Sequence, residues 1–182
     1  MSTAEAQSTS RHARRQVIEW VVVIVAAFLA AAVLRATVVQ AFSIPSVSME
    51  KTLLVGDRVL VNKQNRAAHV GDIVVFKRPP GEGNAGIKDL IKRVIATEGQ
   101  TVSAKDGKLY VDGTQVKEPY LQPGMQTIMD GPPVTVPKGD VWVMGDNRVN
   151  SRDSRFFGPI KKSSIIGHAY IRVWPLSRFG GL

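Results

Sequence analysis

The pattern of hydrophobic and polar positions divides the chain into one continuous apolar stretch and a series of short alternating segments. Residues 17–34 are apolar except for Glu19, and Arg11, Arg14 and Arg15 lie just before them. At helical rise this stretch extends about 27 Å, close to the ~30 Å hydrocarbon core of a bilayer. The pattern predicts a membrane-spanning helix over residues 17–34. The basic residues predict that the tail, residues 1–16, is cytoplasmic.

A cleaved secretory signal is the alternative for this stretch, because basic residues followed by an apolar run also describe such a signal. The run is longer than a usual signal core, and no small-x-small site closes it. Arg35 stands where cleavage would be expected. We therefore expect an uncleaved anchor.

Short segments rich in β-branched residues follow the apolar stretch, each flanked by turn residues. Asp106 and Gly107 indicate a hairpin between residues 101–103 and 109–111, with the turn type left open. Residues 79–86 and 122–137 are rich in Pro and Gly and are expected to be loops. The fold class is therefore mostly β. Strands are predicted over residues 58–62, 72–76, 91–96, 108–112, 140–144 and 168–174.

Composition narrows the classes of function. A hydrophobic content of 44% over 182 residues supports the core of one modest domain. The 24 Lys and Arg residues against 15 acidic residues, a net charge of +9, favour contact with acidic lipid headgroups or nucleic acid. Nucleic acid is the less favoured partner, because no aromatic residues interleave the basic ones in a recognition motif. With no Cys and 3 His residues, we expect neither metal nor cofactor.

Two short segments carry the candidate chemistry: Ser46-Val47-Ser48-Met49 and Ile91-Lys92-Arg93-Val94. A serine hydroxyl is a weak nucleophile and needs a neighbouring base, and a lysine can act as that base if burial keeps it neutral. The apolar neighbours of Lys92 provide such surroundings, and strand alternation sends Arg93 to the opposite face. The ordinary alternative for a lone strand lysine is a solvated side chain.

A Ser-His-Asp triad is the competing arrangement. His69 or His168 would then have to pair with Asp72, Asp146 or Asp153. His69 precedes a Gly-Asp turn and His168 begins a predicted strand, where a surface or structural histidine is the usual outcome. The Ser/Lys pair is therefore favoured.

Four sequence blocks, taken together, carry a family resemblance. The blocks are residues 42–49 (FSIPSVSM), 71–76 (GDIVVF), 92–94 (KRV) and 145–155 (GDNRVNSRDSR). Their order and spacing resemble those of bacterial type I signal peptidases, which are membrane-anchored serine proteases with a Ser/Lys dyad. Three positions depart from the usual pattern: Lys51 replaces a common proline, Leu90 a common aromatic residue, and residues 97–100 a Pro-Gly-Asp turn.

The resemblance implies a signal-peptidase-like β-sheet catalytic domain over residues 36–98 and 139–182, with a smaller β subdomain inserted at residues 99–138. It follows the membrane-spanning helix at residues 17–34. The family implies no cofactor, and its substrates are the signal peptides of secretory preproteins. It further implies a site in the bacterial plasma membrane with the catalytic domain outside the cytoplasm, in contact with lipids and near the protein-export channel. Thylakoid and mitochondrial relatives use similar chemistry.

The resemblance also assigns roles to individual residues. Ser48 is expected to form an acyl-enzyme, with Lys92 as general base. The Ser46 hydroxyl is expected to help the Ser48 amide bind the oxyanion, and its ordinary alternative is a turn cap after Pro45. Ser151 is expected to hydrogen-bond Lys92. A supporting ion-pair cluster is expected from Asp153, Arg155 and Arg93.

Shallow apolar pockets are expected to admit only small side chains at the first and third substrate positions before the cut. The substrate is expected to bind as an added β-strand. Ordinary core packing is the alternative for each wall residue. The wall candidates are Phe42, Ile44, Met49, Leu53, Val75 and Ile91.

Two other classes of protein share part of this pattern. A self-cleaving repressor-type protease uses the same Ser/Lys chemistry but needs a DNA-binding helical domain in place of the apolar stretch. A noncatalytic, membrane-anchored binding module would be indicated by loss of Ser48 or Lys92, and both residues are present.

Overall fold

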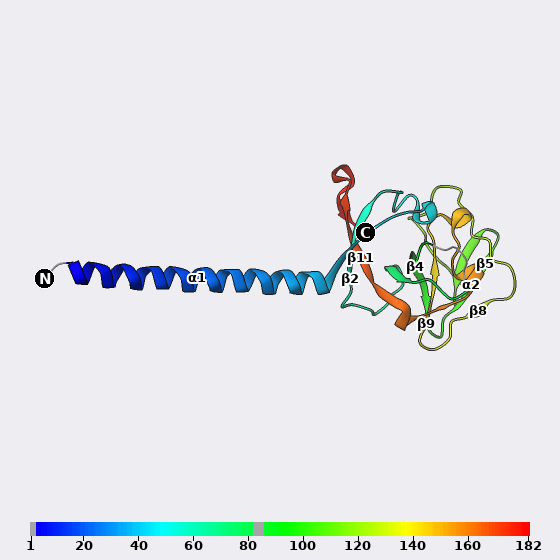
Figure 1. The fold of residues 1–182 in the computed structure, drawn as a ribbon. Helices are drawn as coiled ribbons and strands as arrows, with labels where there is room; N and C mark the ends of the chain where they lie inside the picture. The colour runs from blue at the N-terminus through cyan, green and yellow to red at the C-terminus, as the bar shows by residue number, and fades with distance from the viewer. Residues whose placement is uncertain (1–2, 82–85) are drawn as a thin grey trace. The chain divides into compact units, whose positions relative to one another are not determined.

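The computed structural model describes residues 3–81 and 86–182, and the chain forms two units, residues 1–38 and 39–182. The first unit contains a single helix, α1, Thr3–Val38 (Figure 1). Its 36 residues extend about 54 Å at helical rise. The side chains of residues 16–32 are all exposed, including those of Trp20 and Phe28.

The sequence predicts a membrane-spanning helix over residues 17–34. Within residues 3–81 and 86–182, no helix is found that is long and apolar enough to cross a membrane.

The second unit is built around an antiparallel sheet with the strand order β1-β2-β11-β3-β4-β9-β10, and β12 pairs with β11. Strand β4 lies inside this sheet, because it pairs with β3 along one edge and with β9 along the other. The bounds are β1 Val39–Ser43, β2 Arg58–Asn62, β3 Ile73–Lys77, β4 Asp89–Thr97, β9 Asp140–Met144, β10 Ile160–Lys161, β11 Ile165–Trp174 and β12 Gly180–Gly181.

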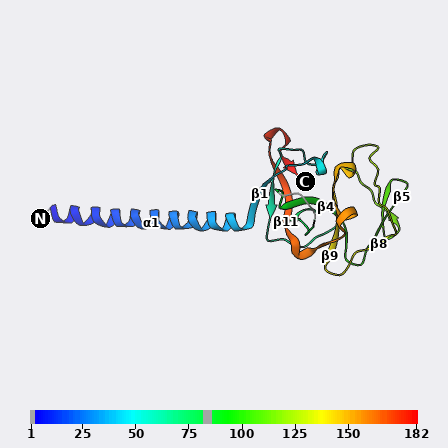
Figure 2. The same ribbon diagram turned by 45° about the vertical axis from the view of Figure 1, so that its right-hand side comes forward.

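A smaller antiparallel sheet has the order β7-β6-β5-β8. Figure 2 shows its strands β5 and β8 to one side of β9. The predicted hairpin joins β5 and β6, with Lys105 paired to Lys108. Asp106 and Gly107 both have positive φ angles, 51° and 73°, the requirement of a type I′ turn. The bounds are β5 Thr101–Lys105, β6 Lys108–Val111, β7 Thr114–Gln115 and β8 Val134–Thr135.

Short helices occupy several connections between strands. Helix α2, Ser154–Phe157, is preceded by its N-cap Asp153, whose side chain accepts a hydrogen bond from the Arg155 amide. The 3₁₀ helices are η1 Val47–Met49, η2 Arg148–Asn150, η3 Lys162–Ser164 and η4 Leu176–Arg178.

The core lies on both faces of the large sheet, so the side chains of β3 are buried on both. Ile73 and Val75 pack into one apolar cluster, and Val74 and Phe76 pack into another. A third cluster, which includes Trp142 of β9 and Leu109 of β6, joins the two sheets. Full burial of a side chain such as Phe76 stabilises the fold by roughly 1.5–3 kcal/mol.

The mostly β class predicted from the sequence is confirmed. Each predicted strand has a counterpart: β2 and β9 have the predicted bounds, and the bounds of β3, β4, β6 and β11 differ by one to three residues. Strand β1, the strands of two residues and helix α2 were not predicted from the sequence.

Candidate active site

Ser48 lies in η1, in the connection between β1 and β2. The ends of this connection are held together by backbone hydrogen bonds from the Ile44 amide to Asp57 O and from the Gly56 amide to Ile44 O, each 2.9 Å long. The side chains of Met49 and Leu53 are fully buried and anchor the connection in the core. Ser48 is therefore presented on a loop whose flanks are fixed.

Lys92 lies on β4, and its side chain contacts that of Ser48. Its Nζ atom donates a hydrogen bond to Ser48 Oγ at 2.7 Å and another to Ile91 O at 3.0 Å. Lys92 is 3% exposed and Ser48 is 7% exposed. The amine and the hydroxyl are thus in direct contact, away from bulk water.

Burial lowers the pKa of Lys92 from 10.5 to about 8, because desolvation disfavours the charged amine. The negative charges of Asp153 and Asp146 oppose this shift, and the positive charge of Arg78 adds to it. The net effect brings the pKa of Lys92 close to neutral pH, where the amine can both accept and release a proton.

Ser46 lies beside the same hydroxyl. Its Oγ atom is 3.3 Å from Ser48 Oγ. Ser46 is the N-cap residue of η1, but its side chain makes no capping hydrogen bond there. The turn-capping alternative is therefore absent, and the hydroxyl faces the candidate nucleophile.

Ser151 does not make the contact that was expected of it. Its Oγ atom is buried and has no hydrogen-bond partner among the described residues, so the expected bond to Lys92 is not formed. The hydroxyl instead packs against Gly145, where an added Cβ atom would come within 2.2 Å of Ser151 Oγ and 2.4 Å of Ser48 O. Glycine at position 145 allows these segments to approach closely.

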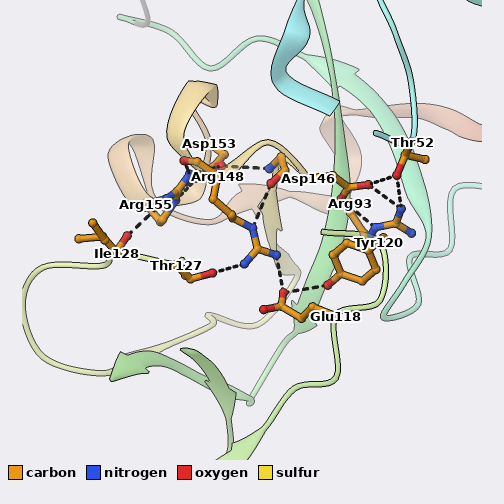
Figure 3. A network of polar contacts seen from close by, with 11 residues as sticks. Thr52, Arg93, Glu118, Tyr120, Thr127, Ile128, Asp146, Arg148, Asp153 and Arg155 are labelled. Atoms are coloured by element: carbon orange, nitrogen blue, oxygen red, sulfur yellow. Dashed lines mark hydrogen bonds and ion pairs between the residues drawn. The ribbon is translucent and has the colours of Figure 1, made fainter. Parts of the chain in front are cut away.

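The expected ion-pair cluster is two separate pairs. Arg155 donates to both carboxylate oxygens of Asp153, at 2.9 Å each, and Asp153 also accepts the Gly145 amide at 3.0 Å. Arg93 does not join this pair. It donates to Asp146 at 2.9 and 2.7 Å (Figure 3), because alternation along β4 turns it away from Lys92. The prediction of one cluster was wrong.

Several contacts of this network were not predicted from the sequence. Asp146 accepts hydrogen bonds from Thr52 as well as Arg93 (Figure 3). The buried Arg148 pairs with Glu118 from the long connection between β7 and β8. Position within the block at residues 145–155 was the only sequence signal for Asp146 and Arg148, and Glu118 had none.

Two shallow pockets adjoin the site. One, of about 280 Å³, is lined in part by four of the wall candidates, Phe42, Ile44, Val75 and Ile91. The other, of about 260 Å³, contains Ser48 and Lys92 and shares Ile91 with the first.

Met49 and Leu53 line neither of these pockets. Both side chains are fully buried in the core, so their prediction as wall residues was wrong. Apolar character alone did not distinguish a pocket wall from the core behind it.

Two histidines lie beside Asp72 and not beside Ser48. His69 Nδ1 and His168 Nδ1 lie 3.3 and 3.4 Å from the same oxygen, Asp72 Oδ2. Ser48 instead has Lys92 and Ser46 as its side-chain partners. Among residues 3–81 and 86–182, no group of three or more His, Asp or Glu side chains is placed to hold a metal ion.

A serine hydroxyl in contact with a buried amine, in a mostly β domain beside shallow pockets, is an arrangement suited to hydrolysis through a serine nucleophile. Comparison with known protein families agrees with this class. Residues 17–174 match the family described as "Signal peptidase, peptidase S26".

The following two relatives point to the same family. A probable signal peptidase I-1 of Synechocystis is 44% identical over 163 residues, covering 86% of this chain and 82% of the relative. Signal peptidase I of Mycobacterium tuberculosis is 36% identical, covering 98% and 80%. A signal peptidase I crystal structure from Enterococcus faecalis is 29% identical, with a TM-score of 0.46, and covers 56% of this chain and 96% of that one.

The chain belongs to the signal peptidase I family, peptidase S26. It is a serine peptidase that removes signal peptides from preproteins.

Proposed function

We propose that this peptidase cuts preproteins after a small-x-small sequence, through an acyl-enzyme on Ser48 with Lys92 as general base. The carrying observation is the 2.7 Å contact between Lys92 Nζ and Ser48 Oγ, made by a lysine that is 3% exposed. At this distance a proton can pass directly between the two atoms. A pKa of about 8 leaves roughly a tenth of the amine neutral at pH 7.

The proton balance of the acylation step follows from this pair. Neutral Lys92 takes the Ser48 proton as Oγ bonds to the scissile carbonyl carbon. The resulting ammonium returns that proton to the leaving amine as the C–N bond breaks. Water then attacks the ester, losing a proton to Lys92, and the C–Oγ bond breaks as Oγ is reprotonated. Each half of the reaction uses the same base.

The tetrahedral intermediate carries a negative oxygen that needs hydrogen-bond donors. The Ser46 hydroxyl lies 3.3 Å from Ser48 Oγ and makes no capping bond, which supports a donor role together with the Ser48 amide. Removal of one such donor typically costs about 10²–10³ in rate.

The Asp153–Arg155 and Arg93–Asp146 pairs have supporting roles. The first holds the Gly145 amide, and the second holds the turn after β9 against β4.

An edge of β4 is available to receive an extended substrate. Residues 93–97 pair with β9, whereas residues 89–92 pair only with β3 among the described strands. A substrate strand added at this edge would present alternate side chains to the two pockets that share Ile91. The shallow, partly apolar walls favour small side chains, which supports a small-x-small preference.

The decisive test is cleavage of a preprotein that carries Ala-x-Ala before its mature start, in detergent or lipid. Mass spectrometry should locate a single cut after the second alanine. Ser48→Ala should lose this cut, and Ser163→Ala, at an exposed serine outside the site, should keep it. Cleavage by Ser48→Ala at the wild-type rate would contradict the proposal.

We also propose that residues 17–34 attach the chain to the bacterial plasma membrane, with the catalytic unit outside the cytoplasm. The support is the exposed apolar side chains of α1, such as Val25 and Leu29, and the basic residues that precede them. An enzyme held there would meet preproteins near the export channel. The full chain should stay with membranes after alkaline extraction, and the double substitution Val25→Lys and Leu29→Lys should release it. Release of the unaltered chain would contradict the attachment.

A further inference from the structure

Three cations beside the active site converge on one short segment, Glu118–Leu121, which we refer to as the 118–121 segment. The segment lies in the connection between β7 and β8 of the smaller sheet. Lys51 follows Ser48 by three residues, Arg93 is the neighbour of Lys92, and Arg148 follows the turn at residues 145–147. Each part of the catalytic site therefore has its own link to the same segment.

Lys51 links the Ser48 loop to the segment through its amine. Its Nζ atom donates to Pro119 O at 3.1 Å and to Leu121 O at 2.8 Å. The backbone of Lys51 has a φ of 78°, in the left-handed region that residues with a side chain rarely adopt. A proline, common at this position in the family, cannot reach this φ.

Arg93 links the Lys92 strand to the segment through an aromatic ring. Its guanidinium carbon lies 4.1 Å from the centre of the Tyr120 ring, within range of a cation–π contact (Figure 3). The Tyr120 hydroxyl donates to Glu118 Oε1 at 2.9 Å. Burial raises the pKa of Tyr120, so its hydroxyl keeps the proton that it donates.

Arg148 links the turn at residues 145–147 to the segment through a buried ion pair. Its guanidinium is fully buried and pairs with Glu118, and its Nε atom donates to Gly145 O at 3.0 Å (Figure 3). The same turn contacts the nucleophile loop, because the Asn147 amide donates to Ser48 O at 3.1 Å. The Glu118 carboxylate therefore accepts hydrogen bonds from both Arg148 and Tyr120.

We propose that the 118–121 segment is a positioning element for the reaction, holding the Ser48 loop, the Lys92 strand and the 145–147 turn in one relative placement through Lys51, Tyr120 and Glu118. This inference rests on the proposed roles of Ser48 and Lys92. Small displacements matter at such a site, because a misplacement of about 1 Å can cost roughly 10²-fold in rate. Tyr120 and Lys51 are positioning residues, since neither touches the reacting atoms.

The test uses the full chain in detergent and an Ala-x-Ala preprotein peptide, with kcat and KM measured separately. Lys51→Met and Tyr120→Leu should each lower kcat roughly tenfold, with KM within about twofold of the wild type, because the pocket walls are untouched. Lys51→Arg keeps a donor and Tyr120→Phe keeps the ring, so both should recover most of kcat. Lys117→Met, at an exposed lysine next to the segment, is the matched control and should leave both constants unchanged.

Thermal unfolding of each variant separates positioning from loss of fold. Assays run well below the unfolding temperature should still show the fall in kcat. Wild-type kcat in both Lys51→Met and Tyr120→Leu would overturn the inference, as would a fall that only parallels the unfolded fraction. Failure of the wild-type chain to cut would overturn the proposed function itself, and with it this role of the segment.

Discussion

Lys92 and Arg93 are neighbours on β4 that face opposite sides of the strand. The Lys92 amine donates to Ser48 Oγ at 2.7 Å, whereas the Arg93 guanidinium donates to Asp146 at 2.7 Å. Alternation keeps the permanent cation of Arg93 paired with a carboxylate and on the far side from the amine. The Lys92 amine can therefore lose its proton near pH 8 while the Arg93 guanidinium stays paired with Asp146, which is the basis of the pH predictions below.

Replacement of the buried amine should separate activity from stability. Lys92→Met should lower cleavage by at least roughly 10²–10⁴-fold, because no base remains beside Ser48. Stability should be kept or increased, since the desolvation of a buried amine is removed. Peptide cleavage and urea unfolding of the same preparation measure both effects. Lys108→Met, at an exposed lysine, should change neither, and a cleaving Lys92→Met enzyme would exclude Lys92 as the base.

The pH dependence of cleavage should follow the neutral form of Lys92. Its pKa of about 8 lies below the 10.5 of an unburied lysine, so kcat/KM should rise with pH and level off above about 8. Between pH 8 and 10.5, the Lys92 amine binds more protons in the unfolded state than in the folded state. The free energy of unfolding should therefore rise with pH across that window. A profile already flat at pH 6 would contradict this assignment.

Arg78 provides a test of the electrostatics. Its positive charge lowers the pKa of Lys92, so Arg78→Gln should raise that pKa and move the acid limb of the kcat/KM profile to higher pH. The neighbouring Lys77→Gln, which removes an exposed charge, should leave the limb in place. An acid limb that moves to lower pH in Arg78→Gln would show that another group controls the profile.

Asp153 should be important for stability. It is fully buried, pairs with Arg155 and accepts the Gly145 amide. Asp153→Ala leaves the buried Arg155 guanidinium without its carboxylate, which should cost about 3–5 kcal/mol of unfolding free energy. Urea denaturation measures this loss, and Asp130→Ala at an exposed aspartate is the comparison. A loss below about 1 kcal/mol would mean that the pair contributes little.

Ile91 should control the size of the accepted side chain, because it lines both pockets. Ile91→Ala should increase cleavage of a Leu-x-Ala substrate relative to Ala-x-Ala by roughly tenfold or more. Competition between the two peptides in one reaction measures the ratio. Val94→Ala, on the same strand but buried in the core away from the pockets, should leave the ratio unchanged. An unchanged ratio in Ile91→Ala would remove Ile91 from the set of wall residues.

Local sequence determined where most of the strands lie along the chain. Residues 58–62 and 140–144 were predicted as strands with the bounds that the structure has, because β-branched residues flanked by turn residues specify such segments locally. The Asp106-Gly107 hairpin was equally predictable. Strand β1 was missed, since all of its side chains are exposed or half-buried and give no clear alternation.

The candidate site was predictable only where sequence order carries the information. Ser48 and Lys92 were found through the block pattern, and Arg93 was correctly assigned to the opposite face by alternation. Its partner, Asp146 rather than Asp153, was not predictable, because two nearby aspartates have the same chemistry and differ only in where the turn after β9 places them.

The sequence by itself determined the mostly β class, the main strands, the Ser/Lys pair and the family resemblance, because these depend on local propensity and on the order of residues. Only the tertiary structure decided that Met49 and Leu53 are core rather than pocket wall, that Ser151 does not reach Lys92, and that Lys51, Arg93 and Arg148 meet the 118–121 segment. Such contacts join residues dozens of positions apart. Their geometry follows from how the two sheets pack, which no local pattern encodes.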